Sequence, residues 1–361
     1  MDNKVLKQET IALGLCNLFG KYGYLPYKMS KFEEYDLYAK YKEFLGNTRI
    51  VTFTDVDGKL LALKPDITLS IVKNDADGGA KRKVYYKENV YRVSKNSGGF
   101  KELLQAGVEC IGDLDLYDVY ETVYLAAASL ALVSKNFVLD ISHLGVLSAV
   151  MEEAKGREGF EKAALRAVSE KNMHGLKEVC KEYGAKEEKL LALVQAYGSP
   201  KQVLSQIQPL CQSERAKAAF DDLKALCGLL ENTEYANNIR LDFSVVNSGK
   251  YYDDILFKGF IDGVGEGVLS GGRYDKLLNR MGKKSGAIGF AVYLDLLESL
   301  TKTQSANDVD VLVLYGEDTP VQSVVDEVDK QVKSGNTVSA QKTKNGVRYK
   351  KIVDLQGGEI C

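Results

Sequence analysis

The sequence is poor in the side chains that bind metal ions. It has only two histidines, His143 and His174, and its six cysteines form no C-x-x-C pair: Cys16, Cys110, Cys180, Cys211, Cys227 and Cys361. A structural zinc site takes four cysteine or histidine ligands, usually at short spacings. The sequence therefore predicts no metal site, and we expect no bound cofactor.

Excess charge and long apolar runs are also missing. The net charge of -2 and the pI near 6.0 give no overall attraction to phosphate backbones. The polar start, residues 1–9, does not resemble a secretory signal, and no uninterrupted apolar run reaches 18 residues. We expect a cytoplasmic protein with reduced thiols and no membrane contact.

The length of 361 residues exceeds what one hydrophobic core usually organises. Composition is ordinary for a globular protein, with 45% apolar and 27% charged residues. The polar segment 301–308 has the character of a linker. We expect a large domain over residues 1–305 and a small α/β domain over residues 306–361.

The first third of the chain shows helix and hairpin signals. Apolar residues recur at helical spacing over 5–19, and two β-leaning runs, 49–53 and 60–63, flank Asp57-Gly58, a strong hairpin signal. Asp66 precedes an apolar run at 67–72 and can cap a short helix there. A second, longer hairpin is predicted from strands at 83–93 and 103–111.

The rest of the chain alternates between helical and strand patterns. Residues 116–133 and 144 to about 230 favour helices, and strands are predicted at 238–246, 255–261 and 267–269. A helix at 274–281 precedes the segment 286–297, and 309–315, 321–332 and 338–342 predict a strand, a helix and a strand. Strands on both sides of a helical block indicate an α+β fold with a helical insertion at about 145–235.

One face of the second hairpin can hold a small zwitterion. Residues two or four apart on a strand share a face, so Gln105 and Glu109 point the same way and can meet Arg92 across the strand pair. An ordinary solvated face is the alternative, and for any single charged strand residue it is favoured by about two to one.

These segments resemble a known family. Tyr91-Arg92 with Gln105-Ala106-Gly107-Val108-Glu109 resembles motif 2 of the histidyl-tRNA synthetases, and Ser270-Gly271-Gly272-Arg273-Tyr274-Asp275 resembles the approach to their motif 3. Leu63-Lys64-Pro65-Asp66-Ile67-Thr68 is similar to their amino-acid loop. The resemblance implies a class II synthetase-like antiparallel sheet flanked by helices.

The resemblance also implies a histidine pocket. Asp66, Thr68 and Gln105 would receive the ammonium group, while Glu109 and a tyrosine of the Tyr251-Tyr252 pair would hold the imidazole, with Arg92 on the same wall. Neighbours on a strand face opposite sides, so at least one of these two rings could simply pack in the core. We expect Tyr252 to contact the ligand.

The departures from the synthetases concern ATP. Leu296 occupies the position of the motif 3 arginine, and Asn247 stands where the synthetases carry an arginine before the paired tyrosines, with Lys250 close by. Neither leucine nor a flexible lysine replaces a bidentate guanidinium. Ser30 replaces the motif 1 proline, and the C-terminal unit is about half the size of an anticodon-binding domain, so we expect no tRNA binding.

This combination is similar to the regulatory subunits of ATP phosphoribosyltransferase. The stretch 251–260 and the helix junction around Lys171-Asn172 carry that likeness. It implies a non-catalytic subunit of the first step of histidine biosynthesis, which binds free histidine and both activates and feedback-inhibits a short-form catalytic subunit. It also implies a homodimer within a hetero-oligomer. An active histidyl-tRNA synthetase or another adenylate-forming paralogue is the alternative.

Three further features carry no chemistry in this interpretation. His143 and His174 are expected to cap helices or lie on the surface, as lone histidines near helix junctions usually do. Gly271-Gly272 lacks a nucleotide-loop pattern and is expected to allow close backbone approach in a sheet.

Overall fold

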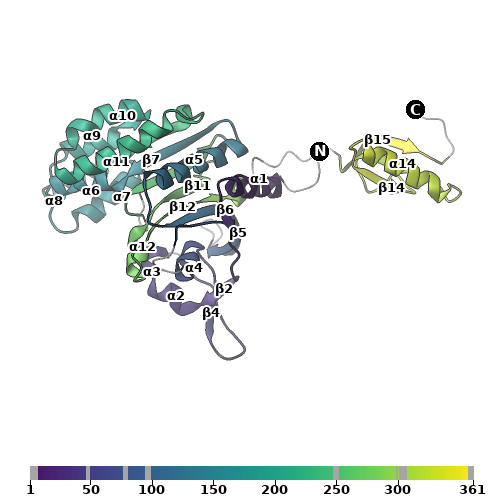
Figure 1. Cartoon of the computed structure of the whole chain (residues 1–361), viewed down its shortest axis with the longest axis horizontal. Coiled ribbons are helices and arrows are strands. Elements are labelled where there is room, and N and C mark those ends of the chain that lie inside the picture. The colour runs from purple at the N-terminus through teal and green to yellow at the C-terminus, as the bar shows by residue number, and fades with distance from the viewer. Residues whose placement is uncertain are drawn as a thin grey trace. The chain divides into compact units, whose positions relative to one another are not determined.

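The computed structural model describes residues 7–45, 49–75, 80–93, 99–246, 252–297, 300 and 307–356 (Figure 1). The chain divides into two compact units: Ile11–Leu297 is one, and Glu298–Cys361 with Met1–Thr10 is the other. The predicted boundary at 305/306 lies outside the described residues. Each unit is considered by itself.

The larger unit is built on a nine-stranded sheet of order β1-β5-β6-β12-β11-β10-β7-β9-β8. Its pairs are antiparallel except β1 with β5 and β7 with β9. The strands are β1 Leu25–Pro26, β5 Arg82–Val93, β6 Phe100–Gly112, β7 Phe137–His143, β8 Tyr197–Gly198, β9 Ile239–Asp242, β10 Ile255–Ile261, β11 Leu269–Arg273 and β12 Gly286–Tyr293. A mainly antiparallel sheet with helices confirms the predicted α+β class.

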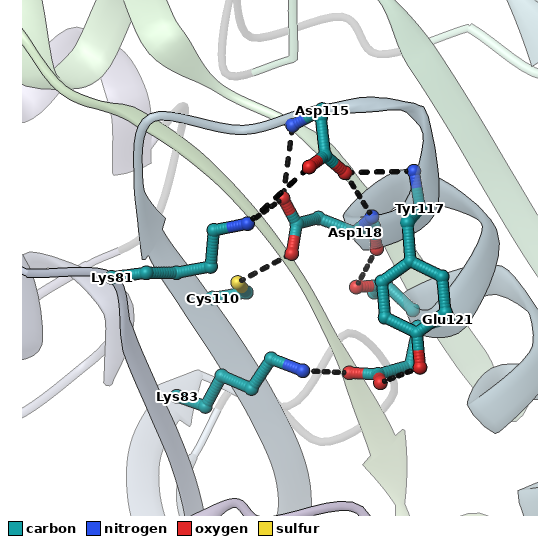
Figure 2. Close-up of polar contacts among 8 residues, drawn as sticks. Lys81, Lys83, Cys110, Asp115, Tyr117, Asp118 and Glu121 are labelled. Atoms are coloured by element: carbon teal, nitrogen blue, oxygen red, sulfur yellow. Dashed lines mark hydrogen bonds and ion pairs between the residues drawn. The ribbon is translucent and has the colours of Figure 1, made fainter.

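Helix α5, Leu116–Val133, packs on one face of this sheet. Asp115 caps it by accepting from the backbone N–H groups of Tyr117 and Asp118. Lys81 and Lys83 of the β5 side bind the buried carboxylates of Asp118 and Glu121, at 2.6 and 2.5 Å (Figure 2). By length and hydropathy α5 could cross a membrane, but these contacts and its burial against the sheet make it a core helix.

A helical block follows β7, as predicted. It contains α6 Leu144–Glu153, α7 Phe160–Ser169, α8 Met173–Tyr183, α9 Glu188–Gln195, α10 Pro200–Ile207 and α11 Glu214–Leu230. His143 is the N-cap of α6, accepting from Gly145 N–H at Nδ1, and His174 is exposed on α8. Both histidines therefore take the structural places expected of them.

Smaller elements cover the other face of the sheet, where α2, α3 and α4 lie in Figure 1. Helix α1, Lys7–Lys21, precedes them, and β2 Phe32–Glu34, β4 Leu60–Leu63 and β3 Thr52–Thr54 form a three-stranded sheet. The helices are α2 Tyr35–Lys40, α3 Lys42–Leu45 and α4 Thr68–Lys73. The Asp57-Gly58 hairpin is confirmed. The N-cap position of α4 is Ile67, and Asp66 Oδ1, one residue earlier, accepts from Leu69 N–H in the first turn at 3.0 Å.

The strand predictions differ from the structure in the bounds of β9 and β11 and in the strands that were not predicted, which include β1, β2, β7, β8 and β12. Strand β9 ends at Asp242, not at 246, because the Asp242 carboxylate accepts from Ser244 N–H and turns the chain. Strand β11 runs through Gly271-Gly272 to Arg273. A Cβ on Gly272 would lie 2.6 Å from Ile255 O, which confirms close approach in a sheet. The patterns predicted no strand at β7.

Over residues 307–356, the C-terminal unit is a three-stranded parallel sheet of order β14-β13-β15 that packs against helix α14. Its elements are β13 Val309–Leu314, α14 Val321–Lys333, β14 Val338–Gln341 and β15 Tyr349–Asp354. The small α/β unit is thus confirmed, with β15 as an additional strand. In the larger unit, α12 Asp275–Arg280 and the 3-10 turn Leu294–Leu297 flank β12.

Candidate functional site: a buried amino-acid pocket

A cavity of about 230 Å³ lies between α4 and the middle of the large sheet. It brings together six of the seven residues predicted to bind histidine: Asp66, Thr68, Arg92, Gln105, Glu109 and Tyr252. They come from the start of α4, β5, β6 and the segment before β10. The seventh, Tyr251, lies outside the described residues, as do Asn247 and Lys250.

Glu109 forms the floor of the pocket. Thr68 Oγ1 donates to its Oε1 at 2.7 Å, and the Tyr274 hydroxyl donates to its Oε2. Burial raises the pKa of Glu109 to about 8, although the hydrogen bonds from Thr68 and Tyr274 lower it. The group is therefore protonated at neutral pH in the empty pocket and can exchange a proton with a ring nitrogen of a ligand.

Asp66 and Arg92 place opposite charges at one end of the pocket. Arg92 Nε donates to Pro65 O at 2.7 Å, and an Nη of Arg92 lies 3.7 Å from the Asp66 carboxylate. Burial raises the pKa of Asp66, and the Arg92 guanidinium opposes this effect. A carboxylate beside a guanidinium complements the ammonium and carboxylate groups of a free amino acid.

Gln105 carries a polar group without a protein partner. Its side chain is 3% exposed, and its amide nitrogen forms no hydrogen bond with any described residue. A buried unpaired amide is unfavourable unless a ligand satisfies it. The predicted ammonium contact needs the amide oxygen, which a half-turn of the amide would present, because the two ends are nearly isosteric.

Tyr252 reaches the pocket through close packing on β11. A Cβ on Gly272 would lie 2.7 Å from the Tyr252 ring, so glycine at 272 makes room for it. Burial raises the pKa of the Tyr252 hydroxyl well above its usual value. The hydroxyl is therefore neutral and able to donate, and Tyr252 lines the cavity.

Sequence reasoning missed four further wall residues: Tyr86, Ser270, Tyr274 and Tyr293. Tyr274 lies in the Ser270–Asp275 motif that carried the family resemblance, so that motif was the available signal. Its hydroxyl donates a hydrogen bond to Glu109, which lies 165 positions earlier in the sequence.

A second cavity of about 680 Å³ shares Arg92, Gln105 and Tyr252 with the first. Leu296, at the position of the motif 3 arginine, lines it next to Asp295, which accepts from Leu104 N–H at 2.5 Å. Leu296 gives this wall an apolar side chain where a guanidinium would bind phosphate. No cluster of three metal-binding side chains occurs among the described residues.

Comparisons with known proteins agree with this architecture. Residues 2–297 match the family model for histidyl-tRNA synthetase. The ATP phosphoribosyltransferase regulatory subunit of Bacillus subtilis is 29% identical over 344 residues, covering 92% of this chain and 87% of that protein. The regulatory subunit of Clostridium kluyveri is 30% identical, covering 81% and 78%.

Solved structures share the fold. A protein from Bacillus halodurans, described as an ATP phosphoribosyltransferase regulatory subunit/histidyl-tRNA synthetase, aligns with a TM-score of 0.82 at 23% identity, covering 97% of this chain and 94% of that one. A chain of the ATP phosphoribosyl transferase complex from Thermotoga maritima aligns with a TM-score of 0.64 at 16% identity, covering 80% and 97%. The chain therefore belongs to the histidyl-tRNA synthetase family and, within it, to the ATP phosphoribosyltransferase regulatory subunits.

Proposed function

We propose that this chain is a non-catalytic regulatory subunit that binds free histidine in the 230 Å³ cavity and transmits its occupancy to an ATP phosphoribosyltransferase catalytic subunit. The observation that carries the proposal is the pairing of two complementary ends in one pocket. Asp66 and Arg92 suit the zwitterionic backbone, and Glu109 with Tyr252 suits an imidazole.

The protonation of Glu109 favours imidazole over an apolar side chain. A buried carboxyl with a pKa of about 8 can pass its proton to an imidazole, whose own pKa is about 6.5, once the two form a hydrogen-bonded ion pair. That exchange needs no net proton uptake between roughly pH 6.5 and 8. Below this range histidine binding releases a proton, and above it binding takes one up.

The absence of catalysis is supported by the second cavity. Leu296 lines it, and a leucine offers no charge to the phosphates of ATP. The partner would be the short-form catalytic subunit, which carries out the first step of histidine biosynthesis, and histidine would act as the feedback inhibitor. A coupling of about 1–3 kcal/mol between the two sites is typical of such regulation.

We also propose a homodimer of this chain within the hetero-oligomer. Large apolar side chains are exposed on α1, β1 and α5: Leu13, Leu25, Leu116 and Tyr117. A homodimer interface over these elements would remove the four side chains from water. Binding of tRNA and of membranes has no place in this proposal, and the protein would act in the cytoplasm.

Calorimetric titration of the full chain with free histidine tests the pocket, and a Glu109→Ala, Tyr252→Phe double variant should lose binding. Histidine should also inhibit the catalytic subunit only when this chain is present. The alternative, an active synthetase or another adenylate-forming paralogue, has one supporting observation: the second cavity is roomy enough for a nucleotide. Histidine-dependent exchange of pyrophosphate into ATP by the purified chain would establish it and overturn the regulatory proposal.

A further inference from the structure

The segment that carries Tyr252 is attached to the helical block at both ends. It leaves β9 at Asp242 and enters β10 at Ile255, and residues 247–251 within it lie outside the described part. The contacts with the helical block lie on either side of residues 247–251. Each is made by a side chain next to a helix of the block: Lys171 between α7 and α8, and His143 at the start of α6. Neither of these contacts belongs to the pocket itself.

At the first end, Lys171 binds Asp242. Lys171 Nζ donates to Asp242 Oδ2 at 2.7 Å, and the other oxygen, Oδ1, accepts from Ser244 N–H and Oγ–H at 2.8 and 2.6 Å. One carboxylate therefore joins the block to the turn that starts the segment. Asp242 is buried, and Lys171 is the cation paired with it.

The position of Lys171 is unusual. It lies between α7 and α8 with a φ of 51°, in the left-handed region that non-glycine residues rarely adopt. The next residue, Asn172, caps α8 by accepting from Gly175 N–H at 2.8 Å. The Lys171-Asn172 pair thus fixes the start of α8 and, through the lysine, the start of the Tyr252 segment.

At the second end, His143 and Asp254 meet at the start of α6. Leu144 N–H donates to Asp254 O at 2.9 Å, and His143 Nε2 lies 2.9 Å from Asp254 Oδ1. Burial opposes the ionisation of Asp254, but the contact with His143 lowers the pKa of this carboxyl below its usual value. Arg273, 3.9 Å from the other Asp254 oxygen, belongs to the same motif as Tyr274.

We propose that Lys171 and His143 are positioning residues through which the helical block sets the position of Tyr252 and hence the affinity for histidine. This inference rests on the proposed histidine pocket and deepens it. A partner that shifts α7 and α8 would move Asp242, and histidine bound against Tyr252 would in turn hold the block in place. Coupling of this kind is reciprocal.

The chain offers a matched control for Lys171. Lys189 of α9 binds Glu153 of α6 at 2.6 Å, close to the 2.7 Å of the Lys171–Asp242 pair, and this ion pair lies within the helical block. It has no contact with the Tyr252 segment in the described residues. Lys189→Met therefore removes a comparable ion pair while leaving both attachments intact.

The test is calorimetric titration of the full chain with histidine, together with hydrogen exchange. Lys171→Met should weaken histidine binding about tenfold, Lys171→Arg should restore most of it, and Lys189→Met should stay within about twofold of the wild type. In the wild type, histidine should protect backbone amides of Met173–Tyr183 from exchange. Lys171→Met should abolish that distant protection. Equal affinity and equal protection in Lys171→Met would overturn the inference.

Two further experiments distinguish a failure of this inference from a variant that does not fold and from a failure of the proposed function. If Lys171→Met does not fold, the Lys171→Met, Asp242→Asn double variant, which leaves no unpaired buried charge, replaces it with the same expectations. If the wild-type chain binds no histidine, the proposed function fails. Hydrogen exchange of the ligand-free protein then tests whether Lys171 holds the Tyr252 segment in place. The backbone amides of residues 252–261 should exchange faster in Lys171→Met than in Lys189→Met, and equal rates would show that Lys171 does not hold the segment.

Discussion

Gly289 and Glu109 face each other across β12 and β6, and a Cβ on Gly289 would overlap the Glu109 carboxylate. The same Cβ would also collide with Val108 O. Because the second obstacle is backbone, it cannot move away cheaply. The carboxylate at the floor of the pocket therefore owes its place to the missing side chain on the neighbouring strand.

Gly289→Ala should consequently abolish histidine binding and also lower the free energy of unfolding, because the clash with Val108 O strains the β6–β12 pair. Since the methyl group and the Glu109 carboxylate compete for one space, Glu109 must turn away from Thr68 and Tyr274. Calorimetric titration measures the loss. Gly228→Ala on α11, where a Cβ meets nothing within 4 Å, is the control and should bind normally. Normal binding by Gly289→Ala would show that Glu109 does not contact the ligand.

The ligand-free protein should lose stability as the pH rises from 4.5 to 8, in part because of Glu109. Its pKa is 4.5 in its ordinary state and about 8 in the fold, because of burial. Between these values the folded state holds a proton that the unfolded state has released, so stability falls by up to about 1.4 kcal/mol per pH unit. Below pH 4.5 and above pH 8 this contribution is constant.

Glu109→Gln removes that titration. The free energy of unfolding of the variant, measured with urea, should therefore exceed that of the wild type by an amount that grows from pH 5 to pH 8. Parallel pH profiles for the two proteins would mean that Glu109 has an ordinary pKa in the fold.

Arg92→Met should reduce histidine affinity by about ten- to a hundredfold, the usual value of a charge-assisted hydrogen bond. It should also reduce the preference for histidine over histamine, which lacks the carboxylate that Arg92 would hold. Lys101→Met is the control, because Lys101 pairs with Arg92 in the β5–β6 register and lines only the second cavity. An unchanged preference in Arg92→Met would remove Arg92 from the ligand site.

The buried Lys64–Glu88 ion pair should contribute to the stability of the fold. Lys64 is 0% exposed and lies 2.5 Å from the Glu88 carboxylate, directly before Pro65-Asp66 at the start of α4. Lys64→Met leaves Glu88 without its partner and should destabilise the fold by about 3–5 kcal/mol. The Lys64→Met, Glu88→Gln double variant should recover part of this loss in urea denaturation. A double variant no more stable than the single one would show that packing, not charge, dominates.

Local patterns predicted much of the fold. The Asp57-Gly58 turn, the hydrogen bond from the first turn of α4 to Asp66 and the long hairpin of β5 and β6 follow from short-range chemistry, and the structure confirms them. The alternation rule also placed Gln105 and Glu109 on one face. The end of β9 was not predicted. The hydrogen bond that Ser244 N–H donates to the Asp242 carboxylate turns the chain there, although the sequence beyond it favours a strand.

The site was predictable only as far as the family motifs reached. The ligand-binding roles predicted for Asp66 and Glu109 came from the family resemblance, and their contact network was not predicted. The role of Tyr274 depends on β12 lying between β6 and β11, an arrangement that no local pattern encodes. The same holds for Lys171, whose partner Asp242 is 71 positions away.

The strand order also determines when the pocket can form during protein synthesis. Strand β12 is the last strand of the large sheet to be made, yet it pairs with β6 in the middle of that sheet. A nascent chain can form the helices of α6–α11 from local contacts, but closing the sheet requires a long-range pairing, which is slow. Until Tyr293 has left the ribosome, the cavity that Gly289 and Tyr293 help to line is incomplete, so the proposed histidine pocket can form only after the whole of β12 has been made.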